Sequence, residues 1–430
     1  MKYGKVLLNM IACVLGSGVI GILLLCLVYL IPVSPLYQHV KDSAYVFKIE
    51  GTWPVRRGRA ANRLDNYTDA LMLGNAIIHK EGASLMERAL RVYFPWSAEK
   101  TPDRILVDYV EGRDELSLGT YSRYWHGYLV FLKPVLLFTD YLGIRGMNRV
   151  LQAALVFAVL AALWKYRRKR AILPFLFAIA YLRPAFLMYS MQYADIFYIS
   201  LCAMLGVLFG NEKLKKGNRY LFYFLFVGVI TNYIDFLTYP IASLGMPLVT
   251  WLILQEEMGW KERTGHVFLY AASWAFGYFG MWIGKWILAA GILGDFRIIS
   301  DAFSQAQTRM SPVRDAVSFP RSGAVLANFQ VGFEGIGMAA GAGAALVLLY
   351  ILWRQRWNIP LFWFHCAPYL LICIMPLAWY LFLANHSMVH AFFTYKAMAM
   401  SVFAFLCMGA MATPASGSRA KCGIRKRPVP

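Results

Sequence analysis

Charged residues are scarce in this sequence. Asp, Glu, Lys and Arg make up 15% of the 430 residues, whereas 59% are hydrophobic and the mean hydropathy is +0.50. Soluble domains carry about 25% charged and about 45–50% apolar residues, so a water-soluble protein with one core is excluded. The sequence also lacks a Gly-rich phosphate loop, a nucleotide fingerprint, a Ser/His/Asp order and internal repeats. It therefore carries no signature of a soluble nucleotide-binding domain or a serine hydrolase.

Cysteine is absent from the two long polar segments, residues 32–126 and 293–335. Of the seven cysteines, only Cys422 lies outside an apolar stretch, in the basic tail. The sequence therefore predicts no disulfide framework outside a membrane, and no CxxC or Cys/His spacing indicates a zinc or redox site.

Long apolar runs are what the sequence has in place of charge. A helix crosses a bilayer with about 17–25 apolar residues, and the sequence predicts an all-α integral membrane protein with about ten such helices. Extracytoplasmic amphipathic and juxtamembrane helices are expected beside them. The predicted spans are residues 11–31, 148–164, 171–189, 194–210, 219–238, 241–254, 265–292, 336–353, 361–383 and 391–412.

Basic residues indicate the orientation of the chain. The net charge is +20, and Lys and Arg cluster in short runs between apolar stretches, such as residues 165–170. Cytoplasmic segments of membrane proteins are enriched in Lys and Arg, so the charge is interpreted as a topology signal and no nucleic-acid partner is expected. Both ends are predicted in the cytoplasm, and the polar working surface on the extracytoplasmic face of a bacterial plasma (inner) membrane.

The predicted spans divide the chain into successive regions. Residues 1–31 hold the cytoplasmic N-terminus and the first helix, and residues 32–147 form an extracytoplasmic loop with surface and re-entrant helices. Residues 148–292 form transmembrane helices 2 to 7, and residues 293–335 form a second extracytoplasmic loop. Residues 336–412 form helices 8 to 10, and residues 413–430 form a basic cytoplasmic tail. The first helix is expected to be an uncleaved signal anchor, because its apolar run is long and no A-x-A site follows.

The first loop contains amphipathic runs at residues 65–79 and 83–92, which predict helices on the membrane surface. The apolar stretch 127–138 is too short for a span and is interrupted by Lys133 and Pro134. It therefore predicts an interfacial or re-entrant helix.

Ionisable groups at membrane depth are informative because burying them is costly. In this sequence they fall in the outer halves of the predicted helices, which predicts one polar cluster that opens outward. Its members are Arg183, Tyr189, Gln192, Asn232, Asp195, Asp235, Lys285, Asn385, His386, His390 and Lys396. Snorkelling of the long side chains to the outer headgroups is the alternative without a function.

Two carboxylates in the first loop are candidate catalytic groups. In the run RLDNYTDA, Asp65 and Asp69 lie four residues apart and share one face if a helix starts there. A carboxylate at the membrane surface can deprotonate a sugar hydroxyl or position a cation. Helix capping is the alternative, with Asp65 as N-cap and Asp69 in the first turn.

Two further segments mix basic and aromatic residues. In NHSMVHAFFTYK, His386 and His390 lie one helical turn apart, with Lys396 further along, and this set can bind a phosphate. Zinc is the disfavoured alternative, because neither an HExxH pattern nor a third ligand accompanies the histidines. In YSRYWHGY, Arg123 can meet a lipid phosphate and the aromatics can pack on sugar rings, although anchoring in the headgroups is the simpler interpretation.

This layout resembles the GT-C class of membrane glycosyltransferases, which have a first helix, a long loop with surface helices and acidic residues, and then a helical bundle. The resemblance implies a polyprenyl-phosphate sugar donor, a glycan or lipid acceptor in the cell envelope, and an inverting transfer. It further implies that a loop carboxylate is the base and that cations hold the phosphate. By position these are Asp65 or Asp69 for the base, and Arg183, His386, His390 and Lys396 for the phosphate. Many members carry the key acid close behind the first helix, whereas Asp65 lies further along.

Other possibilities stay open from the sequence. Asp65, Asp69, Asp195 and Asp235 can hold a hard divalent cation such as Mg or Mn. A carrier or flippase for lipid-linked sugars or small solutes is the alternative function, because charges at membrane depth also mark transport pathways. The sequence lacks the inverted repeats common in transporters. A non-catalytic assembly partner is a third possibility.

Overall fold

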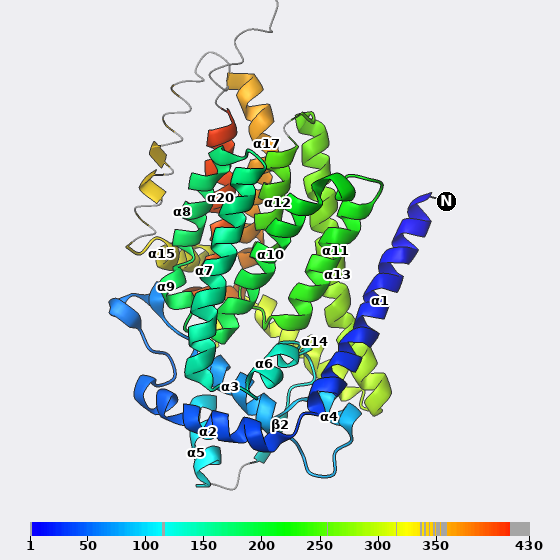
Figure 1. The fold of residues 1–430 in the computed structure, drawn as a ribbon, viewed down its shortest axis with the longest axis vertical. Helices are drawn as coiled ribbons and strands as arrows, with labels where there is room; N and C mark the ends of the chain where they lie inside the picture. Colours follow the sequence, from blue (N-terminus) through cyan, green and yellow to red (C-terminus); the bar gives the residue numbers. More distant parts are fainter. Residues whose placement is uncertain are drawn as a thin grey trace, which may run out of the picture.

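The computed structural model describes residues 2–113, 117–255, 257–314, 316–335 and 359–412, with isolated positions between 338 and 353. Roughly parallel apolar helices form its body (Figure 1). In the described ranges, five helical segments are long and apolar enough to cross a membrane: Gly4–Tyr29, Tyr141–Lys165, Met191–Leu214, Trp260–Leu293 and Ala391–Ala410. The prediction of an all-helical fold with apolar helices long enough to cross a membrane is therefore confirmed, whereas the number of about ten spans stays a prediction.

The helices of the bundle follow the predicted spans with differences at their ends. They are α1 (Lys2–Tyr29), α7 (Tyr141–Lys165), α8 (Ile172–Tyr181), α10 (Met191–Leu214), α11 (Arg219–Ile234), α12 (Ala242–Leu254), α13 (Trp260–Leu293), α17 (Ile359–Phe382) and α20 (Ala399–Ala412), with η3 (Lys169–Ala171) before α8. The predicted span 336–353 lies outside the described residues apart from isolated positions, and so does the basic tail.

The predicted span 171–189 is not one continuous helix. Helix α8 ends at Tyr181, Arg183 has a φ of 56°, and the short α9 (Pro184–Leu187) follows. Proline lacks an N–H donor and disfavours the α conformation in the residue before it, so the helix breaks here. The predicted span 391–412 is likewise built from α19 (Ala391–Thr394), η4 (Tyr395–Met398) and α20 in succession.

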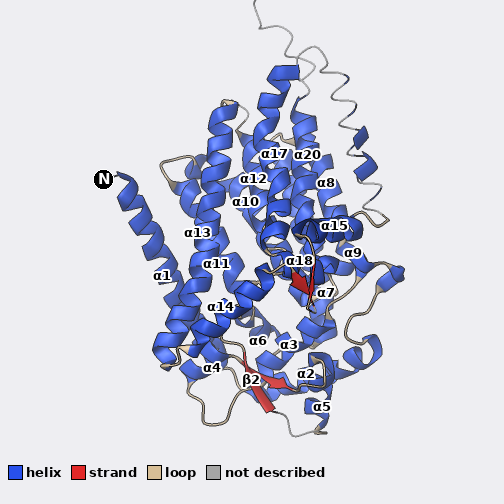
Figure 2. Ribbon diagram, turned by 180° about the vertical axis from the view of Figure 1, so that it is seen from behind, coloured by secondary structure: helices blue, strands red, loops and turns tan. Residues whose placement is uncertain are grey.

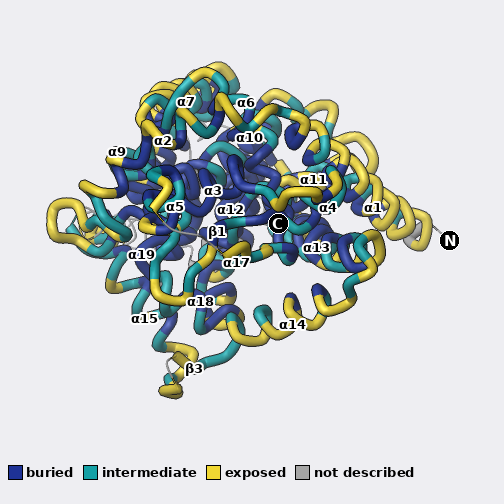
Figure 3. Tube along the Cα trace, turned by 90° about the horizontal axis from the view of Figure 1, so that it is seen from below, coloured by how far each residue is buried: buried dark blue, intermediate teal, exposed yellow. Residues whose placement is uncertain are grey.

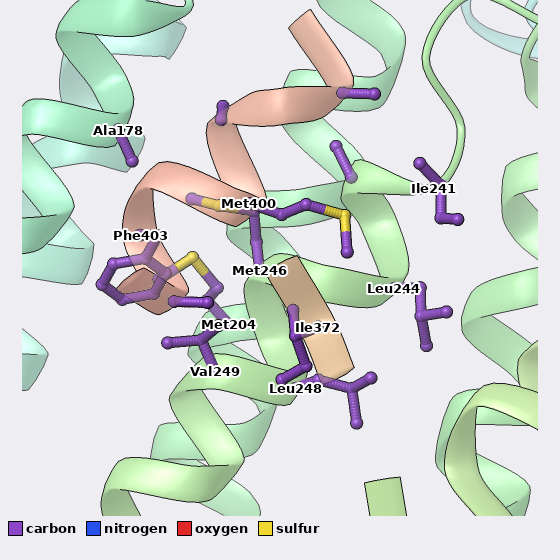
Figure 4. Packing of buried hydrophobic residues seen from close by; sticks show 14 of the residues in the cluster. Ala178, Met204, Ile241, Leu244, Met246, Leu248, Val249, Ile372, Met400 and Phe403 are labelled. Atoms are coloured by element: carbon purple, nitrogen blue, oxygen red, sulfur yellow. The ribbon is translucent and has the colours of Figure 1, made fainter. Parts of the chain in front are cut away.

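Helix α12 lies at the centre of the bundle. All of its residues from Ala242 to Ile253 are buried, as expected for a helix that is apolar on every side. It packs against α10, α17 and α20. Met204 of α10, Val249 of α12 and Phe403 of α20 gather in this core, and all three are fully buried (Figure 4).

Helices α11 and α13 approach each other closely at two glycines. A Cβ atom on Gly228 would lie 2.1 Å from the carbonyl oxygen of Trp274, and one on Gly277 would lie 2.2 Å from that of Leu225. Small residues at such a crossing let two helix backbones pack together.

Replacing Gly277 with Ala is expected to destabilise the protein by about 1–3 kcal/mol, because the α11 backbone must move away. The matched control is Gly284→Ala on the same helix, where a Cβ meets no atom within 4 Å. The control is expected to be neutral or stabilising by up to about 1 kcal/mol. Thermal unfolding of the purified proteins in detergent measures both, and equal effects would contradict the close crossing.

The residues between α1 and α7 gather at one end of the bundle, which we call the loop end (Figure 1). Its elements are α2 (Val33–Glu50), η1 (Arg56–Gly58), η2 (Ala60–Asn62), α3 (Asn66–Ile77), α4 (Leu85–Arg91), β1 (Tyr93–Trp96), α5 (Pro102–Glu111), β2 (Ser117–Thr120) and α6 (Leu129–Val135). Strands β1 and β2 pair antiparallel (Figure 2).

The predicted helices at 65–79 and 83–92 are α3 and α4, and the predicted short helix in 127–138 is α6. Helix α3 differs from the expectation of a surface helix, because nearly all of its residues are buried. It packs against α2 and α5 on one side and contacts α10 on the other. The sequence analysis missed α2, which starts directly after Pro32.

The segment between α13 and α17 also contributes to the loop end. It comprises α14 (Arg297–Met310), β3 (Val313–Arg314), β4 (Val317–Ser318) and α15 (Arg321–Gly332), and α18 (Ala384–Val389) packs against it. Helix α14 runs along the edge of the molecule with an exposed face (Figure 3). Its Arg309 side chain lies within electrostatic range of His390.

Candidate functional site

Asp65 is buried at the start of α3. Its carboxylate accepts hydrogen bonds from the Thr68 backbone N–H at 3.3 Å and from the Thr68 hydroxyl at 2.8 Å, so the capping alternative holds for Asp65. Burial raises the pKa of Asp65 to about 7; the Thr68 hydroxyl opposes this rise, and the nearby Asp69 carboxylate adds to it. Near neutral pH this carboxyl group can therefore both accept and release a proton.

Asp69 is fully buried and accepts four hydrogen bonds. The donors are the Tyr141 hydroxyl at 2.5 Å, the Ser190 hydroxyl at 3.2 Å, and the backbone N–H groups of Met191 at 3.0 Å and Gln192 at 3.1 Å. Burial raises the pKa of Asp69, and these donors oppose the rise. The carboxylate thus satisfies the first N–H groups of α10, and its lone pairs are occupied by protein groups.

A buried ion pair holds the first loop on the bundle. Arg145 of α7 donates two hydrogen bonds of 2.8 Å to the carboxylate of Glu50 at the end of α2. Its Nε donates to the carbonyl oxygen of Tyr189 at 2.8 Å, and its guanidinium also contacts the Tyr141 hydroxyl at 3.2 Å. This bidentate geometry fixes α2 and α7 relative to the start of α10.

Lys396 lies in an aromatic pocket formed by Tyr193 and Tyr395. Its ammonium lies 4.6 Å from the ring centroid of Tyr193 and 4.4 Å from that of Tyr395, and it donates a hydrogen bond of 3.4 Å to the Tyr395 hydroxyl. The residue is only 2% exposed. Across the described residues no carboxylate forms an ion pair with it, and a buried cation without an anion is costly. The Asp65 carboxylate also lies within electrostatic range of Tyr193.

The guanidinium of Arg63 is a second cation whose neighbours are mainly aromatic rings. Its guanidinium lies 5.1 Å from the ring centroid of Trp53 and 4.6 Å from that of Phe392, and its Nε is buried without a hydrogen-bond partner. The carbonyl oxygen of Arg63 accepts a hydrogen bond from the Tyr193 hydroxyl at 3.3 Å. Tyr193 therefore links the Arg63 backbone to the pocket around Lys396.

The two predicted histidines lie next to these cations, and burial lowers the pKa of His390 to about 4, so its ring is neutral near pH 7. The ring centroids of His386 and His390 lie 4.8 Å apart, and the ring of His390 stacks on that of Phe393 with 5.1 Å between the centroids. The geometry therefore brings Arg63, which follows η2, and Arg309 of α14 within electrostatic range of His390, and such a group of hydrogen-bond donors suits phosphate binding.

Other predicted residues lie next to this cluster but bind protein groups. Arg183 donates to the Asn62 side chain at 2.8 Å and to the carbonyl oxygen of Glu334 at 2.5 Å. His386 hydrogen-bonds the carbonyl oxygen of Leu237 at 2.7 Å. Both side chains therefore shape the pocket.

Asp235 is the C-cap of α11 and accepts a hydrogen bond from the Thr238 N–H at 2.9 Å. Tyr189 contributes its backbone carbonyl to Arg145, as described above. Gln192 donates its N–H to Asp69, and its side-chain oxygen is buried without a partner in this structure. These residues support the cluster from the start of α10 and the end of α11.

Three predicted residues lie away from Lys396 and Asp65. Lys285 donates to the carbonyl oxygen of Leu90 in α4 at 3.0 Å and lies 5.3 Å from the ring centroid of Trp125. Arg123 pairs with Asp301 of α14 at 3.2 Å at the rim. Asp195 lines an apolar groove of about 770 Å³ between α6, α7, α10 and α11.

Four residues of this site were not predicted from the sequence: Arg63, Trp53, Tyr193 and Arg309. Arg63 meets Phe392 from the other end of the chain, a contact that no local pattern reveals. The only sequence signal was the position of Arg63 two residues before Asp65.

Within the described ranges, no group of three or more His, Cys, Asp or Glu side chains is placed to hold a metal ion. The need for Mg or Mn stays a prediction. Comparison of the chain with known protein families, curated proteins and solved structures finds no match.

Proposed function

We propose that this protein is a membrane glycosyltransferase similar to the GT-C class. It moves a sugar from a polyprenyl-phosphate donor to a hydroxyl group of a cell-envelope glycan or lipid, with inversion, and it works on the extracytoplasmic face of a bacterial plasma membrane. One observation carries the proposal: the buried Lys396 ammonium lies against the ring of Tyr193, the buried Asp65 carboxyl is within electrostatic range of the same tyrosine, and no ion pair joins these two described side chains. An acid and a cation kept apart suit a site that binds both a hydroxyl and a phosphate.

In this mechanism Asp65 accepts the proton of the acceptor hydroxyl while the hydroxyl oxygen bonds to the anomeric carbon. The bond between that carbon and the phosphate oxygen breaks, and its electron pair leaves with the lipid phosphate. Lys396 and Arg63 stabilise the negative charge that develops on the leaving phosphate, and the neutral His390 ring can donate a hydrogen bond to it. Tyr193, Trp53 and Phe392 offer aromatic faces for the sugar ring.

Asp65 is the better base of the two loop carboxylates. Its carboxylate accepts hydrogen bonds from the Thr68 N–H and hydroxyl and from the Trp53 side chain, so a lone pair remains for a substrate hydroxyl. Asp69 instead fixes the start of α10 with four donors. The proposal therefore assigns proton transfer to Asp65 and positioning to Asp69.

Sugar transfer is expected to increase as the pH rises through about 7, because only ionised Asp65 accepts a proton and burial raises its pKa to about 7. Folding stability is expected to change with pH in the opposite direction. A raised native pKa contributes stability in acid, and this contribution is lost as the pH rises through about 7. The pH profile of kcat/KM measures the first effect. A profile that stays flat through neutrality would contradict Asp65 as the base.

A carrier or flippase for lipid-linked sugars is the alternative function. It is favoured by the groove of about 770 Å³, which is almost entirely apolar and has Asp195 in its lining. Charged groups at membrane depth also mark transport pathways. This alternative predicts movement of the lipid-linked sugar between leaflets without cleavage of its phosphate bond.

The deciding experiment incubates the purified protein in detergent with a panel of polyprenyl-phosphate sugars, with and without EDTA. Release of the polyprenyl phosphate supports transfer, and its sensitivity to EDTA tests the predicted divalent cation. Lys396→Met is expected to reduce release by about 10²–10³-fold, the loss seen when one transition-state donor is removed. If no donor in the panel is bound or consumed, the proposal fails and flipping in liposomes becomes the next assay.

A further inference from the structure

A small polar cavity lies where α1 reaches the loop end, and it shares no residue with the cluster around Lys396. Its volume is about 210 Å³, and its wall comes from the end of α1, the following turn, the end of α3, α4 and α6. The polar residues in the wall are Tyr29, His79, Arg88 and Lys133. The proposed glycosyltransferase activity uses none of them.

The basic side chains in this wall have few partners. Lys133 is only 1% exposed; its ammonium donates a hydrogen bond of 2.6 Å to the carbonyl oxygen of Ala76 and lies 5.1 Å from the ring centroid of Tyr29. Arg88 donates its Nε to the carbonyl oxygen of Ala83 at 2.9 Å. Neither of these partners is an anion.

The described residues that line the cavity include no acid. The acids nearby are Glu81, which is exposed and acts on His79, and Glu87, which accepts a hydrogen bond from Tyr93 at 2.5 Å. Burial lowers the pKa of His79, and the positive charges of Arg88 and Lys133 lower it further. Positive charge is therefore concentrated here without a matching carboxylate.

The Tyr29 hydroxyl supplies an independent observation. It is buried and has no hydrogen-bond partner, and the residue is 9% exposed. Buried hydroxyl groups nearly always have a partner, and Arg88 lies within electrostatic range of this one. An unpaired donor beside basic groups fits an acceptor that carries negative charge.

We propose that this cavity binds a phosphate group, with Lys133 and Arg88 supplying charge and the Tyr29 hydroxyl donating a hydrogen bond. The cavity is smaller than the about 300–1,000 Å³ typical of sites for whole drug-sized ligands, so it fits a phosphate with a small substituent. It adjoins the end of a membrane-spanning helix and the exposed Leu30. The phosphate is the headgroup of a phospholipid or a small soluble phosphate.

Two arms of one experiment distinguish these sources. The full-length protein in detergent is mixed with phosphatidic acid or with diacylglycerol of the same chains, and retained lipid is counted by native mass spectrometry. In the second arm, inorganic phosphate or glycerol phosphate is titrated while the thermal midpoint is followed. Preferred retention of phosphatidic acid identifies the lipid headgroup, and protection by the soluble ions identifies a free phosphate.

Variants connect the binding to this cavity. Tyr29→Phe keeps the ring and is expected to weaken phosphate binding roughly tenfold, and Arg88→Gln is expected to weaken it at least as much. Arg91→Gln is the matched control, because Arg91 lies on the same helix and pairs with Asp295 at 3.1 Å. The proposal is overturned if the protein favours neither phosphatidic acid nor soluble phosphate, or if Tyr29→Phe and Arg88→Gln bind like the control.

Discussion

Replacing Asp65 with Asn is expected to lower sugar transfer by about 10²–10⁴-fold, the usual contribution of a general base. The amide cannot take the proton of the acceptor hydroxyl. It nevertheless remains a good N-cap for α3, because Asn and Asp cap helices about equally well. The loss is therefore expected in the rate and not in the fold.

The folded state gives this prediction an internal control. Burial raises the pKa of Asp65 to about 7, so ionised Asp65 is unfavourable in the native protein above that pH. The Asn variant is therefore expected to unfold at the same or a higher temperature than the parent at alkaline pH. Asp42→Asn, an exposed carboxylate on α2, should change neither property. A variant at Asp65 that transfers sugar like the parent would remove this residue from the mechanism.

Local patterns in the sequence predicted the parts of this site that depend on neighbouring residues. The run RLDNYTDA predicted the start of a helix, with capping by Asp65 as the alternative to a catalytic role, and the structure shows that cap at the start of α3. The alternation of apolar and basic runs predicted an all-helical membrane protein. Lys133 and Pro134 correctly indicated that residues 127–138 form only a short helix, α6.

Contacts between distant parts of the chain were beyond these patterns. Arg63 lies between Trp53 and Phe392, and Lys396 lies against Tyr193. A sequence with arginine or lysine near aromatic residues does not show whether the basic side chain contacts lipid headgroups or packs against a buried ring. Only the folded loop determines which aromatic faces surround them.

The burial of α3 could not be predicted from the sequence either. Its polar residues suggested a helix at the membrane surface, whereas Asp69 and Asn75 are both fully buried. Asn75 donates to the carbonyl oxygen of Tyr93 at 3.1 Å, and Asp69 binds α10. Buried polar groups of this kind depend on partners from other elements, so hydrophobic periodicity alone mispredicted the environment of α3.

Replacing Asp69 with Asn is expected to destabilise the protein by about 3 kcal/mol, because buried hydrogen bonds to a charged acceptor are worth about 1.5–3 kcal/mol each. The carboxylate accepts from two hydroxyls and from the N–H groups of Met191 and Gln192. An amide offers one oxygen, and its NH₂ group must face some of these donors. The start of α10 then loses its acceptor, and with it the contact that holds α3 on the bundle.

Thermal unfolding and the rate per folded molecule separate the roles of the two carboxylates. Asp69→Asn should unfold at a clearly lower temperature, yet its remaining folded molecules should transfer sugar at a rate near that of the parent. Tyr141→Phe removes one of the four donors and is the graded control, with an expected loss of about 1 kcal/mol. If Asp69→Asn folds normally but does not transfer sugar, Asp69 is the base and Asp65 only caps α3. Asp65→Asn is expected to fold normally and to lose sugar transfer, whereas Asp69→Asn is expected to lose stability and to keep transfer. The two variants together therefore assign the proton transfer to one residue.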